Sequence, residues 1–155
     1  MNSPVSNTNH SFDLLRGSAD FMNIVLNNIS SSILLLDKNM RLKAFNDSLK
    51  TIFSNNRNED LLYWKCGEAI GCAYQIEEGK ECGSTSHCSN CELRLAAMES
   101  YLNDRAVYKE KVKRPFFNGD NEKINKDLQF STRLFLYNRE KFVIMIIEDI
   151  TNLVN

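Results

Sequence analysis

Four cysteines lie within twenty residues of this chain, and their type and spacing point directly to chemistry. They are Cys72, Cys82, Cys88 and Cys91, with nine, five and two residues between them, and we call them the four-cysteine set. Four thiolates repel one another unless a cation neutralises them, so a metal ion or an iron–sulfur cluster is the expected ligand. Three of the six glycines fall between positions 71 and 83, where they can supply the sharp turns that convergence requires.

Three interpretations of the four-cysteine set follow: an iron–sulfur cluster, a zinc ion, or redox-active thiols without metal. The long first gap and the single Cys-x-x-Cys pair favour the iron–sulfur cluster, because structural zinc sites more often come from two such pairs. Zinc is the alternative cofactor. With zinc bound, the chain would be an interaction domain with a structural metal. The third interpretation is a thiol switch that forms a disulfide reversibly.

Two neighbouring residues are additional candidate ligands. Cys66 lies six residues before Cys72, and its interpretation as a buried apolar residue is preferred over a ligand or redox partner. His87 precedes Cys88 and could replace one sulfur, although four cysteines leave it a solvated or supporting role. Carboxylates are scattered and no glycine pattern for phosphate binding occurs, so we predict no catalytic residues and no enzyme.

Composition and charge restrict the remaining function classes. With 155 residues and 43% apolar content the chain suits one domain, which we place at residues 19–151 after a flexible polar tail over residues 1–18. The net charge of −1 predicts neither nucleic acid nor membrane as partner. The basic stretch 109–114 is interpreted as a solvated strand face. The chain lacks a secretory signal and a membrane-spanning segment, so a reducing cytoplasm is expected.

Periodicity predicts the elements that position the cysteines. Apolar residues four apart indicate an amphipathic helix over 19–30, followed by strands at 33–36 and 41–45 and by a short helix capped by Asn46. The segment 71–91 is expected to be mostly loop, and a capping box of Ser89 and Glu92 to begin a helix that ends near Asn103. Three strands follow at 107–117, 127–137 and 142–148, the last apolar on both faces as in a covered central strand. The buried face of the second long helix is predicted to comprise Leu93, Leu95, Ala96, Met98 and Leu102.

This α+β order resembles the PAS domain, a five-stranded antiparallel sheet with helices on one face, here with a Cys-rich loop. The resemblance covers residues 21–151 and rests on Ala44-Phe45-Asn46 and on the ending Ile147-Glu148-Asp149-Ile150-Thr151. The stretch 66–91, with its Gly-Cys, Cys-Gly and Cys-x-x-Cys pairs, is similar to a bacterial subset with a cysteine-rich insertion. The resemblance implies signal transduction by redox or oxygen sensing through an iron–sulfur cluster.

The resemblance also implies partners and disfavours two cofactors. The helix at 19–30 commonly serves dimerisation in such domains, so a homodimer is expected. The output protein, a histidine kinase or transcription regulator, would act in trans or be fused in a longer chain. Haem is disfavoured because the two histidines fall in the tail (His10) and in the loop (His87). A photochemical flavin is disfavoured because the Asn-Cys-Arg motif is absent. The aromatic residues Phe45, Tyr63, Trp64 and Tyr74 are interpreted as core more readily than as a ligand pocket.

Overall fold

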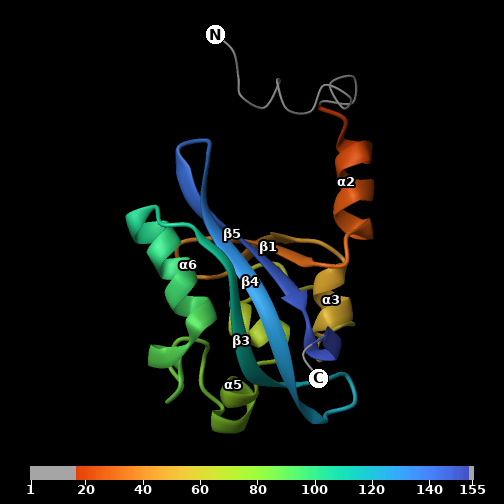
Figure 1. The fold of residues 1–155 in the computed structure, drawn as a ribbon, viewed down its shortest axis with the longest axis vertical. Helices are drawn as coiled ribbons and strands as arrows, with labels where there is room; N and C mark the ends of the chain where they lie inside the picture. The colour runs from red at the N-terminus through yellow and green to blue at the C-terminus, as the bar shows by residue number, and fades with distance from the viewer. Residues whose placement is uncertain (1–16, 154–155) are drawn as a thin grey trace.

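The chain folds into one twisted antiparallel sheet with helices. The computed structural model describes residues 17–153, and its five strands have the order β2-β1-β5-β4-β3 (Figure 1). This architecture confirms the α+β fold class and the five-stranded sheet expected from the sequence. The strands are β1 (Ser32–Leu36), β2 (Leu42–Phe45), β3 (Val107–Phe117), β4 (Lys123–Tyr137) and β5 (Glu140–Asp149); the helices are α2 (Ala19–Asn28), α3 (Ser48–Ile52), α4 (Cys66–Ile70), α5 (Ala73–Glu78), η2 (Cys88–Asn90), α6 (Glu92–Asn103) and η3 (Thr151–Leu153).

The core lies between one face of the sheet and the helices α3, α4 and α6. Along β4, every second residue from Leu128 is buried: Leu128, Phe130 and Thr132. Along β5, Val143, Met145 and Ile147 are buried in the same alternating way. Leu134 and Leu136 continue this face of β4 and become progressively exposed toward the β4–β5 hairpin. The buried face therefore ends where the two strands extend beyond the helices.

The central position of the last strand is confirmed, but its coverage on both faces is not. β5 pairs with β1 on one side and with β4 on the other. Its outward residues Ile144 and Ile146 are half-buried and 37% exposed, respectively. Within the described residues, the outer face of the sheet is thus only partly covered.

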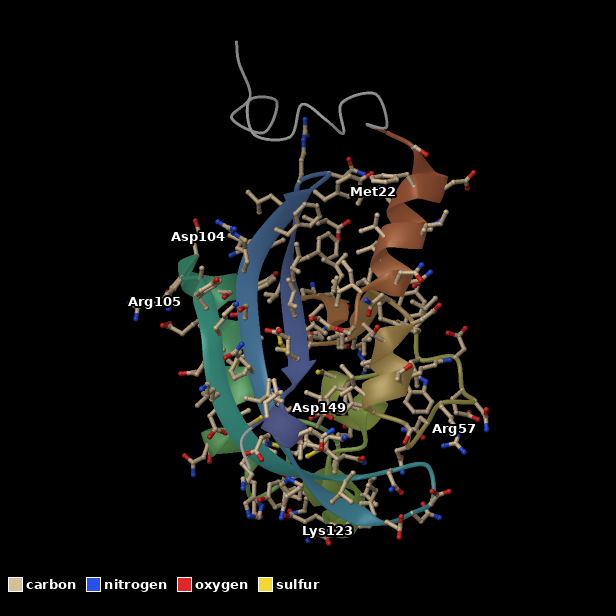
Figure 2. The ribbon with its side chains drawn as sticks, turned by 45° about the vertical axis from the view of Figure 1, so that its right-hand side comes forward. Met22, Arg57, Asp104, Arg105, Lys123 and Asp149 are labelled. Atoms are coloured by element: carbon tan, nitrogen blue, oxygen red, sulfur yellow. The ribbon has the colours of Figure 1, made fainter. Side chains whose placement is uncertain are left out.

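Helix α2 extends from the body of the molecule. It confirms the predicted amphipathic helix, and its cap is Ser18, whose Oγ accepts a hydrogen bond from the Phe21 amide at 3.2 Å. Ser18 therefore belongs to the helix start; residues 1–16 of the predicted tail, with His10, lie outside the described residues. None of the α2 residues is buried. Met22 lies at the same end of the molecule as the β4–β5 hairpin (Figure 2).

Asn46 has a different role from the predicted helix cap. Helix α3 begins after Asp47, which makes no side-chain cap, and Asn46 is 3% exposed. Its side-chain oxygen accepts from the Ile33 amide at 2.9 Å, and its nitrogen donates to the carbonyls of Leu26 (2.7 Å) and Ser31 (3.0 Å). Because a buried amide must satisfy its hydrogen bonds, Asn46 joins β2 to the α2–β1 connection instead of capping α3.

The ending that carried the resemblance is hydrogen-bonded to β4 at the point where β5 ends. Asp149 Oδ1 accepts from both the amide and the hydroxyl of Thr151, at 3.0 and 2.5 Å, and its other oxygen accepts from Lys126 at 2.9 Å. Thr151 in turn accepts from the Asp127 amide at 3.0 Å. Burial alone would raise the pKa of Asp149, but these hydrogen bonds outweigh it and lower the pKa.

Two predictions for helix α6 are wrong. Its N-cap is Cys91, without a side-chain cap bond, and Ser89 lies in η2, so Ser89 and Glu92 form no capping box. Leu95 and Leu102 are 47% and 63% exposed; the buried residues are Leu93, Ala96, Ala97 and Ser100.

Among the described residues, no helix is long and apolar enough to cross a membrane.

Candidate cysteine site

Short helices and the turns between them position the cysteines. Most of the segment 71–91 is non-helical, as expected, but it also contains two short helices: α5 follows Cys72 immediately, and η2 begins at Cys88. Gly71 joins α4 to α5 in the left-handed region, at φ +76°. A Cβ there would lie 2.7 Å from the Asn55 Cβ and 2.9 Å from the Phe117 carbonyl oxygen, so only glycine fits this turn.

All five cysteines line one small cavity. The cavity has a volume of about 40 Å³ and lies between the buried face of the sheet, at Leu36, Phe116 and Met145, and helix α6. The structure brings the four-cysteine set together at this cavity, with Cys66 as a fifth wall residue. Cys66 is 8% exposed and is part of the hydrophobic core, which agrees with its interpretation as a buried residue.

Backbone amides and a hydroxyl surround two of the sulfurs. The Gly67 amide donates to Cys82 Sγ at 3.3 Å, and the Gly83 amide donates to Cys88 Sγ at 3.2 Å. The Thr85 hydroxyl lies 2.9 Å from the same Cys88 sulfur. A Cβ at Gly67 would approach Cys82 Sγ to 2.8 Å, so the backbone of α4 forms the wall against this sulfur. Such donors stabilise negative charge on sulfur.

Two arginines from different elements, Arg94 of α6 and Arg114 of β3, supply positive charge at the cavity. Arg114 is 8% exposed on β3, and a side-chain hydrogen bond joins it to Cys72. It also pairs with Glu92 at 3.4 Å and lies over the ring of Tyr74, 5.1 Å from its centroid. Burial would lower the pKa of Arg114, but the neighbouring cysteine sulfurs outweigh it and raise the pKa. Arg94, from α6, packs on Gly83: a Cβ at that glycine would lie 2.8 Å from Arg94 Nη1.

The thiols differ in acidity because their surroundings differ. Burial raises the pKa of Cys66 well above its usual value, and the neighbouring cysteines add to the effect. Burial also raises the pKa of Cys82 and of Cys91. At Cys88 burial acts in the same direction, but the hydrogen bonds from Thr85 and Gly83 and the charge of Arg94 outweigh it and lower the pKa. Cys88 is thus the cysteine whose surroundings favour the thiolate.

The remaining candidate residues lie outside the cavity wall. His87 stacks on Tyr74, with ring centroids 3.6 Å apart, and its Nδ1 lies 3.5 Å from Glu78 Oε2. Phe45 and Trp64 pack against the core, whereas Tyr63 is 59% exposed; none of the four aromatic residues considered in the sequence lines the cavity. Within residues 17–153, no three Cys, His, Asp or Glu side chains are placed to hold a single metal ion.

Sequence reasoning missed both arginines and Gly67. Residues 109–114 were interpreted as a solvated face, and Arg114 corrects this interpretation. A signal existed, because Arg114 lies two residues from Val112 and two residues from Phe116 and therefore shares their face of β3. Arg94 and Gly67 offered no comparable signal, since their contacts with the cysteines depend on the arrangement of α4 and α6.

Comparisons with known proteins establish the fold. Solved structures match over nearly the whole chain: the PAS domain of nitrogen regulation protein NR(II) from Vibrio parahaemolyticus is 10% identical, with a TM-score of 0.56 over 83% of this chain and 96% of that one. The PAS domain of a Colwellia psychrerythraea protein is 9% identical, with a TM-score of 0.57 over 90% and 99%. The chain has the PAS fold.

A third match concerns part of a longer protein. The structure of an RNA-binding Light-Oxygen-Voltage receptor is 16% identical, with a TM-score of 0.58; the match covers 99% of this chain and 37% of the receptor chain. Models of protein families and curated protein sequences gave no match. At these identities the PAS fold is what the chain shares with the matched structures, and its cysteine site must be interpreted from its own residues.

Proposed function

We propose that the chain is a PAS sensory module that binds an iron–sulfur cluster through the four-cysteine set and responds to redox state or oxygen. One observation carries the proposal: Cys72, Cys82, Cys88 and Cys91 line a single cavity on the helical side of the sheet. PAS domains act as sensors, and a sensory role fits a site without an acid/base or nucleophile pair. We therefore expect no catalytic activity.

The residues at the cavity fit such a group. Four thiolates supply the ligands, the Gly67 and Gly83 amides donate to sulfur, and Arg94 and Arg114 offset negative charge. When bound, an iron–sulfur cluster supplies one-electron redox chemistry and sensitivity to oxygen. Zinc fits less well, because four Zn–S bonds of about 2.3 Å require sulfurs within about 4 Å of one another. Among residues 17–153, no three ligand side chains are placed to hold one ion.

The cysteine segment is joined directly to the sheet, which supports a signalling role. The Phe117 amide donates to the Gly71 carbonyl at 3.0 Å, and Cys72 forms an antiparallel bridge with Phe116. Arg114, on the same strand, contacts Cys72 and Glu92. Loss of ligand from the four-cysteine set would leave like charges or unpaired thiols against β3, and the segment would loosen from the sheet.

The test is anaerobic purification followed by visible absorption and assay of iron, sulfide and zinc on the same sample. The proposal predicts a brown protein with iron and sulfide in matched amounts. Cys88→Ala should abolish the colour, whereas Cys66→Ala should retain it, because Cys66 belongs to the core. A colourless protein with one equivalent of zinc would overturn the cluster assignment and favour an interaction domain with a structural metal.

A thiol switch is the second candidate, and the lowered pKa of Cys88 favours it. A partly exposed thiolate attacks disulfides and peroxides readily, and the remaining cysteines at the cavity would be its resolving partners. This candidate predicts a protein without metal whose free thiols fall by two on mild oxidation and recover on reduction. An unchanged thiol count after oxidation would eliminate it.

Partners and location follow from the same proposal. We propose a homodimer through α2: Met22 and Ile24 of the helix are 50% and 63% exposed, and its C-cap Ile29 is 37% exposed. The dimer would transmit its state to an output protein, a histidine kinase or transcription regulator, in trans or in a longer chain. The reducing cytoplasm would keep the thiols available. Light scattering tests the dimer: the protein should have twice the monomer mass, and Ile24→Asp should halve it. A monomeric protein at micromolar concentration would refute this arrangement.

A further inference from the structure

A basic groove lies beside the cysteine cavity and shares Cys82 with it, but the cationic residues of the groove are not part of the proposed ligand set. It has a volume of about 340 Å³, and four cationic side chains line it: Lys38, Arg41, Lys65 and Arg94. These residues come from the β1–β2 turn, the start of α4 and helix α6, so the fold assembles the charge from separate segments. The lining contains no carboxylate, although the whole chain has 20 acidic and 19 basic residues.

The acidic residues near the groove, Asp37 and Glu81, do not neutralise its positive charge. Glu81 pairs with Lys65 at 3.6 Å, but its side chain is 67% exposed, and such a pair contributes little to stability. Asp37 Oδ1 accepts from the backbone amides of Asn39 and Arg41, at 2.8 and 3.0 Å, and thereby fixes the β1–β2 turn. The Asn39 and Ser84 side chains add hydrogen-bonding groups to the wall.

We propose that this groove binds a small multivalent anion, a polycarboxylate or a phosphorylated metabolite. Its volume falls in the range of small-molecule sites, roughly 300–1,000 Å³. Cations held on separate segments converge on a ligand with several anionic oxygens better than on a monovalent ion. A net charge of −1 provides no extended basic field, which argues for a small ligand over a polyanion.

Arg94 links this groove to the cysteine cavity. Together with Met40 and Cys82 it lines both, and it packs on Gly83, whose amide donates to Cys88 Sγ at 3.2 Å. An anion in the groove would therefore compete with the cysteine sulfurs for the guanidinium group. By linkage, the state of the four-cysteine set would change the affinity for the anion by the same factor. The anion site requires only the cations of the groove, so an anion should still bind, with a changed affinity, when the four-cysteine set holds no ligand.

The test is a fluorescence titration at constant ionic strength, maintained with sodium chloride because salt screens exposed charges. Trp64 is the single tryptophan and directly precedes Lys65, so it reports on the groove. Citrate and inorganic phosphate are the probes. The proposal predicts saturable binding of at least one of them, and the stronger probe identifies carboxylate or phosphate as the preferred ligand chemistry.

Charge variants locate the site. Lys38→Gln and Arg94→Gln should each weaken binding at least fivefold. Lys111→Gln, an equal loss of charge on the exposed side of β3, should change it less than twofold. Equal weakening by all three variants, or a response no larger than that to sodium chloride, would overturn the proposal. Repeating the titration on Cys88→Ala separates the two proposals, because the anion should still bind when metal does not.

Discussion

Replacing Gly67 by alanine should disturb the cysteine site far more than it disturbs the fold. A Cβ at position 67 would lie 2.8 Å from Cys82 Sγ and 3.1 Å from its Cβ, whereas ordinary contact begins at 3.4 Å. The sulfur must therefore retreat by about 0.6 Å, and the 3.3 Å hydrogen bond from the Gly67 amide is strained or lost. Overpacking of this kind costs ~1–3 kcal/mol. Alanine in a helix returns ~1 kcal/mol. The expected net loss of unfolding free energy is thus about 0–2 kcal/mol.

The assay compares metal content with stability. Gly67→Ala should bind less than half the wild-type iron and sulfide after anaerobic reconstitution, because Cys82 no longer faces the other three ligands. Gly79→Ala is the matched control: Gly79 has φ +64° and no heavy atom within 4 Å of a built Cβ. It should lose about 1 kcal/mol of stability from its left-handed backbone and keep its metal. Full metal binding by Gly67→Ala would refute the placement of Cys82 as a ligand.

Three further predictions concern single side chains. Asn46→Ala should lower the urea unfolding free energy by about 2–4 kcal/mol, since it leaves buried backbone groups without partners; a loss below 1 kcal/mol would contradict this role. Ser32→Ala should leave stability unchanged or raise it by up to about 1 kcal/mol, because the buried Ser32 hydroxyl has no hydrogen-bond partner among the described residues. In metal-free protein, alkylation followed by peptide mass spectrometry should label Cys88 at lower pH than Cys91, because the pKa of Cys88 is lowered and that of Cys91 is raised. Labelling of Cys91 at a lower pH than Cys88 would show that the hydrogen bonds to Cys88 do not form.

The three long strands could be predicted from the sequence because 107–117 and 127–137 contain alternating residues and 142–147 is a continuous apolar run. The strand predicted at 107–117 coincides with β3, and those at 127–137 and 142–148 lie inside β4 and β5. Long alternation is a local signal that tertiary contacts reinforce. The helix at 19–30 was predictable for the same reason, within two residues of the end of α2.

The connections were less predictable because tertiary contacts decide them. Helix α5 has six residues, which are too few for a periodic signal, so the sequence alone predicts a loop there. Asn46 has the residue type of a helix cap, but long-range hydrogen bonds to residues 13 to 20 positions away engage its side chain. The gathering of the four-cysteine set followed from its composition and spacing, and its role as a ligand set stays a prediction. The two arginines at the cavity depend on packing between β3, α6 and the cysteine segment.

The arrangement around β3 indicates how a change at the cysteines would reach the rest of the domain. The strand holds the cysteine segment through the Phe117 amide and the Cys72–Phe116 bridge, and it contributes Arg114 to the cavity. A ligand can shift a conformational equilibrium only by its difference in affinity between the two states. Here that difference would arise at Arg114, which contacts both Cys72 and Glu92 of α6. When negative charge at the cysteines falls, Glu92 is the partner that Arg114 keeps, and α6 and β3 are therefore the elements we expect to move.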